Sequence, residues 1–285
     1  MRVVKTVSEI REQVKSWKSE GLKVALVPTM GYLHEGHMSL IKRASKENDK
    51  VVVSIFVNPT QFGPNEDLDD YPRDLEKDKL TCEESGASII FNPEPYEMYV
   101  DGFCTYVETE NLTKELCGKS RPIHFRGVCT VVSKLFNIVS PHRAYFGQKD
   151  AQQLAVIKRM VKDLNFDVEI IGCPIIRESD GLAKSSRNVY LSLEERKAAT
   201  ILNKALSNSK ELLLNGETDS NILKEFIVNE INKENLADID YVEIVDNKTI
   251  EKIDSIEDEV LVAVAVKFGN TRLIDNFIFK GKGEN

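Results

Sequence analysis

Two of the four histidines in the chain lie within one four-residue window, in the segment PTMGYLHEGHMSL at residues 28–40. His34 and His37 follow a run of strand-forming residues and precede helical periodicity, so we expect them where a strand leads into a helix. Main-chain N–H groups and the helix dipole favour anions at such a helix N-terminus. Two imidazole donors there suit phosphate charge that develops during a transfer reaction. The plainer alternative is that His34 caps a turn and His37 fills a gap.

Two common motifs do not account for this segment. Gly31 and Gly36 are spaced as in a phosphate-binding P-loop, but His37 and Met38 occupy the positions where that loop needs Lys and Ser or Thr. A zincin helix needs two histidines four residues apart, whereas His34 and His37 are three apart. The segment therefore predicts an anion site that is neither a P-loop nor a zinc site.

Polar residues also follow the second expected strand, at Asn58 and Gln61 in NPTQF. Pro59 ends the strand there. A neutral amide such as Gln61 suits recognition of the hydroxyl and carboxylate of a hydroxy acid. An ordinary turn after a strand is the alternative.

A second polar segment, RPIHFRG, precedes an expected helix and contains Arg121 and His124. An arginine side chain is well suited to binding a carboxylate through two hydrogen bonds. A solvated surface position is the commoner fate of a single arginine and stays open here.

Two further segments contain side chains that can donate hydrogen bonds to phosphate. Gly147, Gln148, Lys149 and Asp150 follow a strand and begin a helix, where Lys149 can contact phosphate and Asp150 can reach ribose hydroxyls or cap the helix. The polar segment ESDGLAKSSRNVY at 178–190 contains a run of hydroxyl and basic side chains. These patterns predict a phosphate-binding protein.

Strands and helices alternate over the first 175 residues or so. The expected strands are Lys23–Pro28, Lys50–Val57, Ala87–Asn92, Arg143–Gly147 and Asp167–Gly172, and the expected helices lie near 37–48, 72–86, 126–140 and 150–164. This alternation predicts an α/β fold, a doubly wound and mostly parallel sheet whose ligands bind at the carboxyl ends of the strands.

The later part of the chain has a different pattern. Expected helices at Ser192–Asn215 and Asp219–Asn232 precede strands near 239–245, 259–267 and 272–279. Helices followed by antiparallel strands predict a second, smaller α+β domain. We place the domains at residues 1–176 and 177–285.

Composition excludes several classes of protein. The chain has 285 residues and a net charge of −8, and it lacks the basic excess that general nucleic-acid binders use. Apolar stretches such as Val260–Val266 are strand-sized, far short of the roughly 20 residues of a membrane span. The N-terminus has no secretory signal pattern, so we expect a cytoplasmic protein. The five cysteines include no C-x-x-C pair, and we expect reduced, buried thiols.

Five long segments resemble one known family. They are PTMGYLHEGHMSL, FVNPTQFGPNEDLDDYPRDLEKD, RPIHFRGVCTVVSKLFN, FGQKDAQQL and DGLAKSSRNVYLS. The H-x-G-H element in the first resembles the HIGH signature of a nucleotidyltransferase superfamily. Alone it is a weak signal, but the five segments in order resemble the pantoate:β-alanine ligase family over essentially the whole chain. The resemblance supports a Rossmann-like first domain and a smaller lid domain.

The resemblance implies an ATP-dependent condensation of pantoate with β-alanine to give pantothenate, AMP and pyrophosphate through a pantoyl adenylate. ATP is then a substrate, and Mg²⁺ comes with it, held mainly by phosphates and water. No tightly bound organic cofactor, protein metal site, nucleic acid or membrane is expected, and the family pattern implies a homodimer. Neither chemical step needs a protein nucleophile.

The resemblance also assigns site residues. It implies catalytic roles for His37, His34 and Lys149. The residues implied for ATP binding are Met30, Gly31, His34, His37, Gly147, Gln148, Lys149, Asp150, Ile176, Lys184, Ser185, Ser186 and Arg187. Those implied for the organic substrates are Asn58, Gln61, Tyr71, Arg121, His124 and Gln153. The family usually carries an apolar residue where this chain has Lys184, whose charge either contacts phosphate or points to solvent.

Two other functions stay open from the residues. Another H-x-G-H enzyme, which transfers a nucleotidyl group to a phosphorylated alcohol, would share the first and last segments but would give no reason for Gln61, Gln153 and RPIHF. A non-catalytic nucleotide sensor would bind ATP without turnover.

Overall fold

The computed structural model describes residues 1–64 and 66–281, which form two compact units. The first unit comprises Met1–Glu110, Arg121–Gln148 and Val156–Pro174, and the second comprises Asn111–Ser120, Lys149–Ala155 and the chain from Ile175 onward. Two segments that precede residue 176 therefore belong to the second unit by their contacts.

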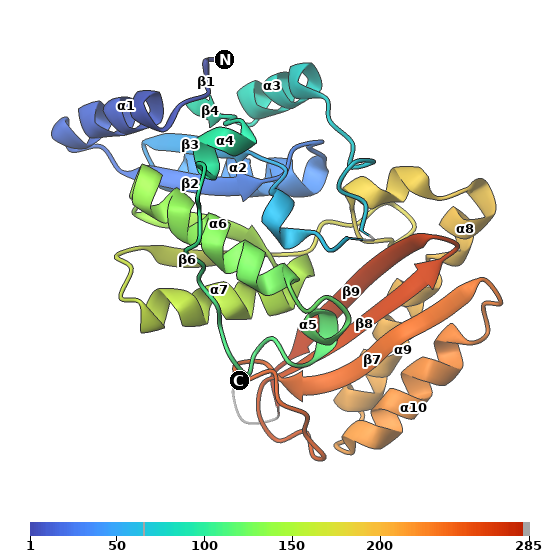
Figure 1. Ribbon diagram of the computed structural model, residues 1–285. Helices are drawn as coiled ribbons and strands as arrows, with labels where there is room; N and C mark the ends of the chain where they lie inside the picture. Colours follow the sequence, from blue (N-terminus) through green and yellow to red (C-terminus); the bar gives the residue numbers. More distant parts are fainter. Residues whose placement is uncertain (65, 282–285) are drawn as a thin grey trace. The chain divides into compact units, whose positions relative to one another are not determined.

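A six-stranded parallel sheet forms the centre of the first unit (Figure 1). Its strand order is β1-β4-β3-β2-β5-β6. The strands are β1 (Val3–Val4), β2 (Val24–Thr29), β3 (Lys50–Ile55), β4 (Ile89–Phe91), β5 (Arg143–Gly147) and β6 (Glu169–Cys173). The predicted parallel sheet and its five strands are confirmed. The edge strand β1 was not predicted, because two residues carry no readable alternation.

Helices cover both faces of this sheet, as the doubly wound prediction requires. Helices α2 (Glu35–Glu47) and α3 (Leu75–Glu84) lie on one face, and α1 (Val7–Ser19) and α6 (His124–Val139) lie on the other. Helix α7 (Ala151–Asp163) contacts α6, where the hydroxyl of Ser133 lies 3.2 Å from the sulfur of Met160. Short helices occur at α4 (Pro95–Met98), α5 (Leu116–Ser120), η1 (Pro59–Gln61) and η2 (Gln148–Asp150).

Burial on both faces explains the apolar strands. Val24, Ala25, Leu26 and Val27 of β2 are fully buried, because helices cover both sides of this central strand. Among the cysteines, Cys82, Cys129 and Cys173 are buried free thiols as expected. The expectation of burial is wrong for Cys104, which lies on an exposed loop, and for the half-buried Cys117.

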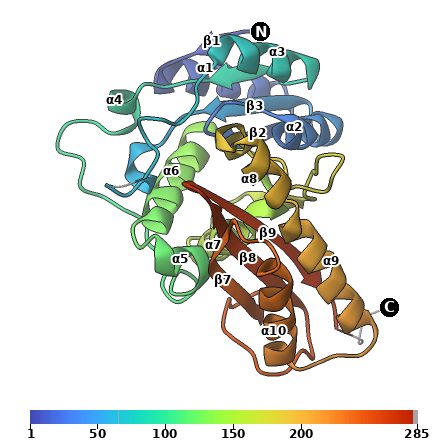
Figure 2. The ribbon, with the colours of Figure 1, turned by 90° about the vertical axis from the view of Figure 1, so that its right-hand side faces the viewer.

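An antiparallel three-stranded sheet, with order β7-β8-β9, forms the centre of the second unit (Figure 2). Its strands are β7 (Ala237–Asp246), β8 (Val260–Phe268) and β9 (Thr271–Phe279), and its helices are η3 (Ser186–Tyr190), α8 (Leu193–Ala198), α9 (Ile201–Leu214) and α10 (Ser220–Ile231). The predicted α+β character is confirmed. The single helix predicted at Ser192–Asn215 is wrong in detail, because the chain breaks it into α8 and α9.

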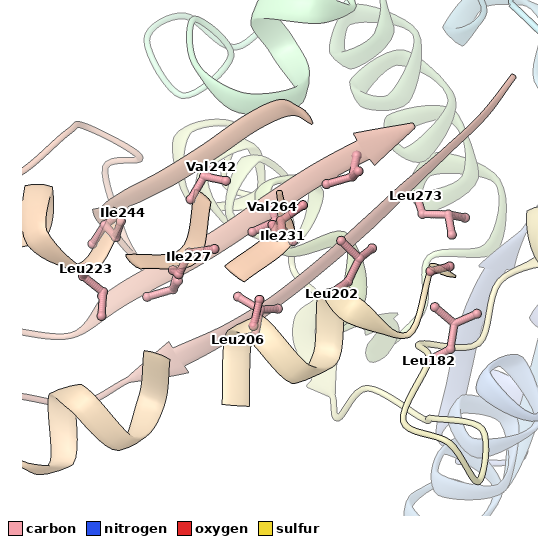
Figure 3. Packing of buried hydrophobic residues seen from close by; sticks show 14 of the residues in the cluster. Leu182, Leu202, Leu206, Leu223, Ile227, Ile231, Val242, Ile244, Val264 and Leu273 are labelled. Atoms are coloured by element: carbon pink, nitrogen blue, oxygen red, sulfur yellow. The ribbon is translucent and has the colours of Figure 1, made fainter. Parts of the chain in front are cut away.

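A hydrophobic core joins the helices of the second unit to its sheet. Side chains of α9 and α10, including Leu206 and Ile227, pack with strand residues such as Val242 and Val264 (Figure 3). The helical period of three to four and the strand period of two thus bring their apolar sides together. No helix in the described part of the chain is long and apolar enough to cross a membrane.

Candidate active site

The first unit has a natural ligand-binding edge where β2 lies between β3 and β5. The chain passes from β2 to β3 and β4 on one side and then returns to β5 and β6 on the other, so the strand order reverses next to β2. Doubly wound sheets bind ligands at this switch point, beyond the carboxyl ends of the strands. Those ends are Thr29, Ile55 and Gly147. Each of the three is followed within a few residues by predicted site residues.

His34 and His37 cap the N-terminus of α2 reciprocally. The Nδ1 of His34 accepts the N–H of Gly36 at 3.1 Å, and the Nδ1 of His37 accepts the N–H of His34 at 3.3 Å. The ring centroids are 4.1 Å apart. Since both Nδ1 atoms accept, each neutral ring carries its proton on Nε2. The helix N-terminus therefore holds two imidazoles whose Nε2–H groups are donors, the chemistry that an anionic phosphate requires.

A buried carboxylate holds the loop that leads into α2. Asp78 on α3 is only 1% exposed, and it accepts the N–H of Tyr32 at 2.9 Å and that of Leu33 at 2.7 Å. Burial raises the pKa of Asp78, and the two hydrogen bonds act in the opposite direction. Gly31 lies in the left-handed region with φ +89°, and a Cβ there would lie 3.0 Å from an Asp78 oxygen. Asp78 thus sets the path of the chain that precedes the histidine cap.

The loop after β3 touches the loop after β2. Gln61 is 7% exposed, and its side-chain amide contacts Asn58 at 3.1 Å on one side and the sulfur of Met30 at 2.9 Å on the other. Gly127 on α6 permits this arrangement, since a Cβ at that position would lie 2.4 Å from the carbonyl oxygen of Thr60. The structure thus brings predicted nucleotide and organic-substrate residues together.

Arg121 is already paired with a carboxylate. Its guanidinium forms a two-point ion pair with Glu66, with Nε 3.0 Å from one oxygen and Nη2 on the other. Burial by itself raises the pKa of Glu66, but the hydrogen bonds and charge of Arg121 outweigh it and leave that pKa lowered.

His124 continues this network to Gln61. Its Nδ1 lies 3.0 Å from the carbonyl oxygen of Gln61, and its Nε2 lies 3.3 Å from Nη1 of Arg121. Since the carbonyl accepts and the guanidinium donates, the neutral ring carries its proton on Nδ1. Arg121 and His124 thus hold the main chain of Gln61 from one side.

The remaining predicted residues of the first unit lie around this edge. Gly147 ends β5 and Gln148 begins η2. Tyr71 is buried, and its ring packs edge-on against Phe62 with centroids 6.0 Å apart. Tyr71 is thus buried against Phe62, the residue that follows Gln61.

The second unit holds the other predicted residues. Asn276 of β9 donates its side-chain N–H to the carbonyl oxygen of Lys149 at 2.8 Å, which connects η2 to the antiparallel sheet. Asp150 is exposed and Gln153 is half-buried. The carbonyl oxygen of Ile176 accepts the N–H of Lys184 at 2.9 Å.

Two arginines anchor the segment that carries Lys184, Ser185, Ser186 and Arg187. Arg177 forms a two-point ion pair with the buried Asp275 at 2.6 and 2.9 Å. Arg196 on α8 bridges Glu178 and Asp180 at 2.7 and 2.8 Å. Ser185 caps η3 by accepting the N–H of Arg187 at 3.3 Å. The side chains predicted to bind phosphate thus lie on a segment that ion pairs and a helix cap hold in place.

The acidic residues that the structure describes do not gather as metal ligands. Among residues 1–64 and 66–281, no group of three or more His, Cys, Asp or Glu side chains could hold a metal ion.

Four residues that touch the predicted site were missed by the sequence predictions: Glu66, Asp78, Tyr99 and Gly127. The sequence contained a pattern from which two of these residues could have been predicted. Asp78 stands one turn before the buried Cys82 on the same face of its helix, and a carboxylate on an apolar face suggests a main-chain partner. Gly127 interrupts the apolar face of α6, which suggests a close approach of another backbone. Glu66 and Tyr99 lie in loops, where no periodicity marks a buried partner.

Comparisons with known proteins give one consistent result. The family model described as pantoate-beta-alanine ligase matches residues 2–278. A pantothenate synthetase of Enterococcus faecalis is 67% identical over 280 residues, which are 98% of this chain and 99% of the relative. A solved pantothenate synthetase from Thermus thermophilus superposes with a TM-score of 0.91 at 46% identity, covering 97% of this chain and 99% of that one.

A second solved structure bears on ligands. It is a pantoate-beta-alanine ligase from Francisella tularensis complexed with β-γ ATP and β-alanine, with a TM-score of 0.81 at 36% identity, covering 98% of this chain and 97% of that one.

Proposed function

The chain belongs to the pantoate–β-alanine ligase family, and from this premise we propose that it condenses pantoate with β-alanine, using ATP. The products are pantothenate, AMP and pyrophosphate, and pantoyl adenylate is the intermediate. The observation that carries the proposal is the reciprocal cap of His34 and His37 at the switch point of the sheet, within a chain that matches this family over residues 2–278.

The first step joins pantoate to the nucleotide. A carboxylate oxygen of pantoate attacks the α-phosphorus of ATP, and the bond to pyrophosphate breaks. Negative charge grows on the phosphate oxygens, and Nε2–H donors of His34 and His37 at the α2 N-terminus would stabilise it. His37 is our candidate for the donor to the leaving pyrophosphate. Lys149 would add a positive charge on the phosphates.

The other nucleotide contacts follow the positions of the motifs. We assign ATP binding to the loop after β2, to the end of β5 with η2, and to the segment before α8. The residues of these contacts are Met30, Gly31, Gly147, Gln148, Asp150, Ile176, Lys184, Ser185, Ser186 and Arg187. Residues 1–176 would form the ATP- and pantoate-binding domain, and 177–285 the lid.

The second step forms the amide bond. The amine of β-alanine attacks the acyl carbon of the adenylate, one N–H proton passes to water, and AMP leaves with the bonding electrons of the acyl–oxygen bond. We assign the organic substrates to Asn58, Gln61, Tyr71 and Gln153. We propose that Arg121 and His124 act beside them by holding the carbonyl of Gln61. Positioning and charge stabilisation supply the catalysis, with no covalent enzyme intermediate.

Three further features belong to the proposal. Mg²⁺ would enter with ATP and be held by its phosphates and water. The protein would act in the cytoplasm as a homodimer formed through its first domain. Size-exclusion chromatography with light scattering tests the dimer, since a monomer mass would reject it.

One incubation tests the function. The protein is mixed with Mg·ATP, pantoate and β-alanine, and AMP and pantothenate are measured. Formation of both supports the proposal. Pyrophosphate without AMP would indicate nucleotidyl transfer to another acceptor, and bound ATP without turnover would indicate a sensor.

Isotope exchange tests the intermediate. Exchange of labelled pyrophosphate into ATP should depend on pantoate and proceed without β-alanine. Exchange that requires both substrates would reject the separate adenylate.

A further inference from the structure

The amide of Asn58 has one orientation that satisfies its neighbours. Its Oδ1 accepts the hydroxyl of Tyr99 at 2.6 Å and the hydroxyl of Thr60 at 3.0 Å, and the main-chain N–H of Thr60 lies 3.4 Å away. Its Nδ2 lies 3.1 Å from the carbonyl oxygen of Gly127. A main-chain N–H can only donate and a carbonyl can only accept, so the opposite orientation would break both contacts.

This orientation determines that of Gln61. The Nδ2 of Asn58 also donates to Oε1 of Gln61 at 3.1 Å. The oxygen of the Gln61 amide therefore faces Asn58, and its Nε2 faces the other way, toward Met30 in the loop after β2. Gln61 thus turns its N–H groups, and not its oxygen, toward that loop.

The packing around the ring of Tyr99 holds its hydroxyl in place. Its ring packs edge-on against Phe103, with centroids 4.9 Å apart, and lies 6.3 Å from the ring of Phe56. The ammonium of Lys134 lies 5.7 Å from the ring centroid. Burial, the largest effect, raises the pKa of Tyr99 to about 12, so the hydroxyl keeps its proton at neutral pH and can donate it.

We propose that Tyr99 is a positioning residue that orients the Gln61 amide through Asn58, so that Gln61 offers hydrogen-bond donors to the organic substrate. This inference rests on the proposed role of Gln61 in binding pantoate. Donors suit a substrate that presents carboxylate or hydroxyl oxygens, and they select against one that presents an amide N–H at the same place. Tyr99 thereby contributes to specificity without contact with the substrate.

The test is Tyr99→Phe, which keeps the packed ring and removes the hydroxyl. We expect the KM for pantoate to rise about tenfold, the factor that one lost hydrogen bond supplies, with the KM for ATP within about twofold of wild type. Tyr106→Phe is the matched control, because Tyr106 lies on the same loop with an exposed side chain. The control should leave both KM values unchanged.

A second variant keeps the test decisive. Asn58→Asp removes the donor to Gln61 and offers an acceptor instead, so the Gln61 amide should flip and point its N–H groups toward residue 58. The KM for pantoate should then rise further than in Tyr99→Phe. An unchanged KM for pantoate in Tyr99→Phe would overturn the inference. An equal rise in the KM for pantoate and the KM for ATP would overturn it too.

Failure of the proposed function gives a different result. If wild-type protein makes no pantothenate, the function is rejected. If wild type is active and Gln61→Ala leaves the KM for pantoate unchanged, the role of Gln61 is rejected, and with it the role of Tyr99. If Gln61→Ala is defective and Tyr99→Phe is not, only the inference about Tyr99 fails.

Discussion

The Nδ1 of His37 accepts the main-chain N–H of His34, and the two rings lie 4.1 Å apart between centroids. Each imidazole therefore has two tasks, one for each nitrogen. Nδ1 caps α2, and Nε2–H is the donor that we assign to phosphate. Substitutions that keep one nitrogen's geometry and remove the other can separate structure from catalysis.

His34→Asn should separate the two tasks. Asparagine is among the best N-cap residues, so the variant should keep the thermal unfolding midpoint of wild type. It lacks the second ring nitrogen, so kcat should fall about 10²-fold. His34→Ala should lose the same activity and also about 1 kcal/mol of unfolding free energy. Thermal unfolding and AMP release measure the two effects. An Asn variant with kcat within threefold of wild type would reject the phosphate role of His34.

His37→Ala and Lys149→Ala should each lower kcat by about 10²-fold or more, the effect of removing one transition-state donor. Steady-state AMP release measures kcat. Lys158→Ala is the control for charge, because Lys158 is an exposed lysine on α7. Its kcat should equal that of wild type. A kcat within threefold of wild type in both test variants would reject the phosphate roles of His37 and Lys149.

Asp78→Asn should weaken the loop that precedes the histidine cap. An amide has one acceptor oxygen, so its nitrogen would face a main-chain N–H of Tyr32 or Leu33 and leave a buried donor unsatisfied. We expect a loss of about 1–3 kcal/mol in unfolding free energy, measured in urea, and a higher KM for ATP. Glu76→Gln on the same helix is the control, since Glu76 is 81% exposed. Equal stability of the two variants would contradict this role of Asp78 in holding the loop.

Gly127→Ala should destabilise the protein although it replaces a glycine within a helix. The new Cβ would lie 2.4 Å from the carbonyl oxygen of Thr60 and 2.5 Å from Cα of Gln61. Overpacking of this kind costs about 1–3 kcal/mol, more than the roughly 1 kcal/mol that alanine otherwise contributes in a helix. Asn137→Ala, at an exposed position of α6, should be neutral or stabilising. Unfolding in urea compares them, and a stabilised Gly127→Ala would show that η1 does not pack as described.

The stability of the second unit should fall as the pH drops below about 4.5, the ordinary pKa of a glutamate carboxyl. Burial by itself raises the pKa of Glu178, but Arg196 outweighs it, and hydrogen bonds from Arg196 lower the pKa of Asp180. Carboxyl groups with lowered pKa values stabilise the fold above their unfolded pKa, and this contribution disappears as the pH falls through the folded pKa.

Arg196→Met should therefore flatten the acid side of the stability profile. Because Asp180 is largely exposed, we expect a difference of only about 1 kcal/mol at pH 7. Thermal unfolding of both proteins from pH 7 to pH 3 measures it. Parallel profiles over the whole range would contradict a contribution from this ion pair.

Much of the fold could be predicted because it depends on local patterns. The β-branched run of β2 and the helical spacing of α7 each lie within a short stretch of chain, and they predicted a strand and a helix. The histidine pair could be placed at a helix N-terminus for the same reason. The length of each element and its apolar side are properties of neighbouring residues.

The sequence by itself determined the family, the alternation of strands and helices around the parallel sheet, and the residue types available for phosphate and carboxylate chemistry. Only the tertiary structure decided which nitrogen of His34 and His37 caps the helix, that Arg121 is paired with Glu66, and which way the amide of Gln61 faces. These depend on hydrogen-bond partners that lie 40 to 70 residues away in the chain or on exact side-chain geometry. Pattern and spacing report local conformation, whereas donor and acceptor pairing is settled when distant segments meet.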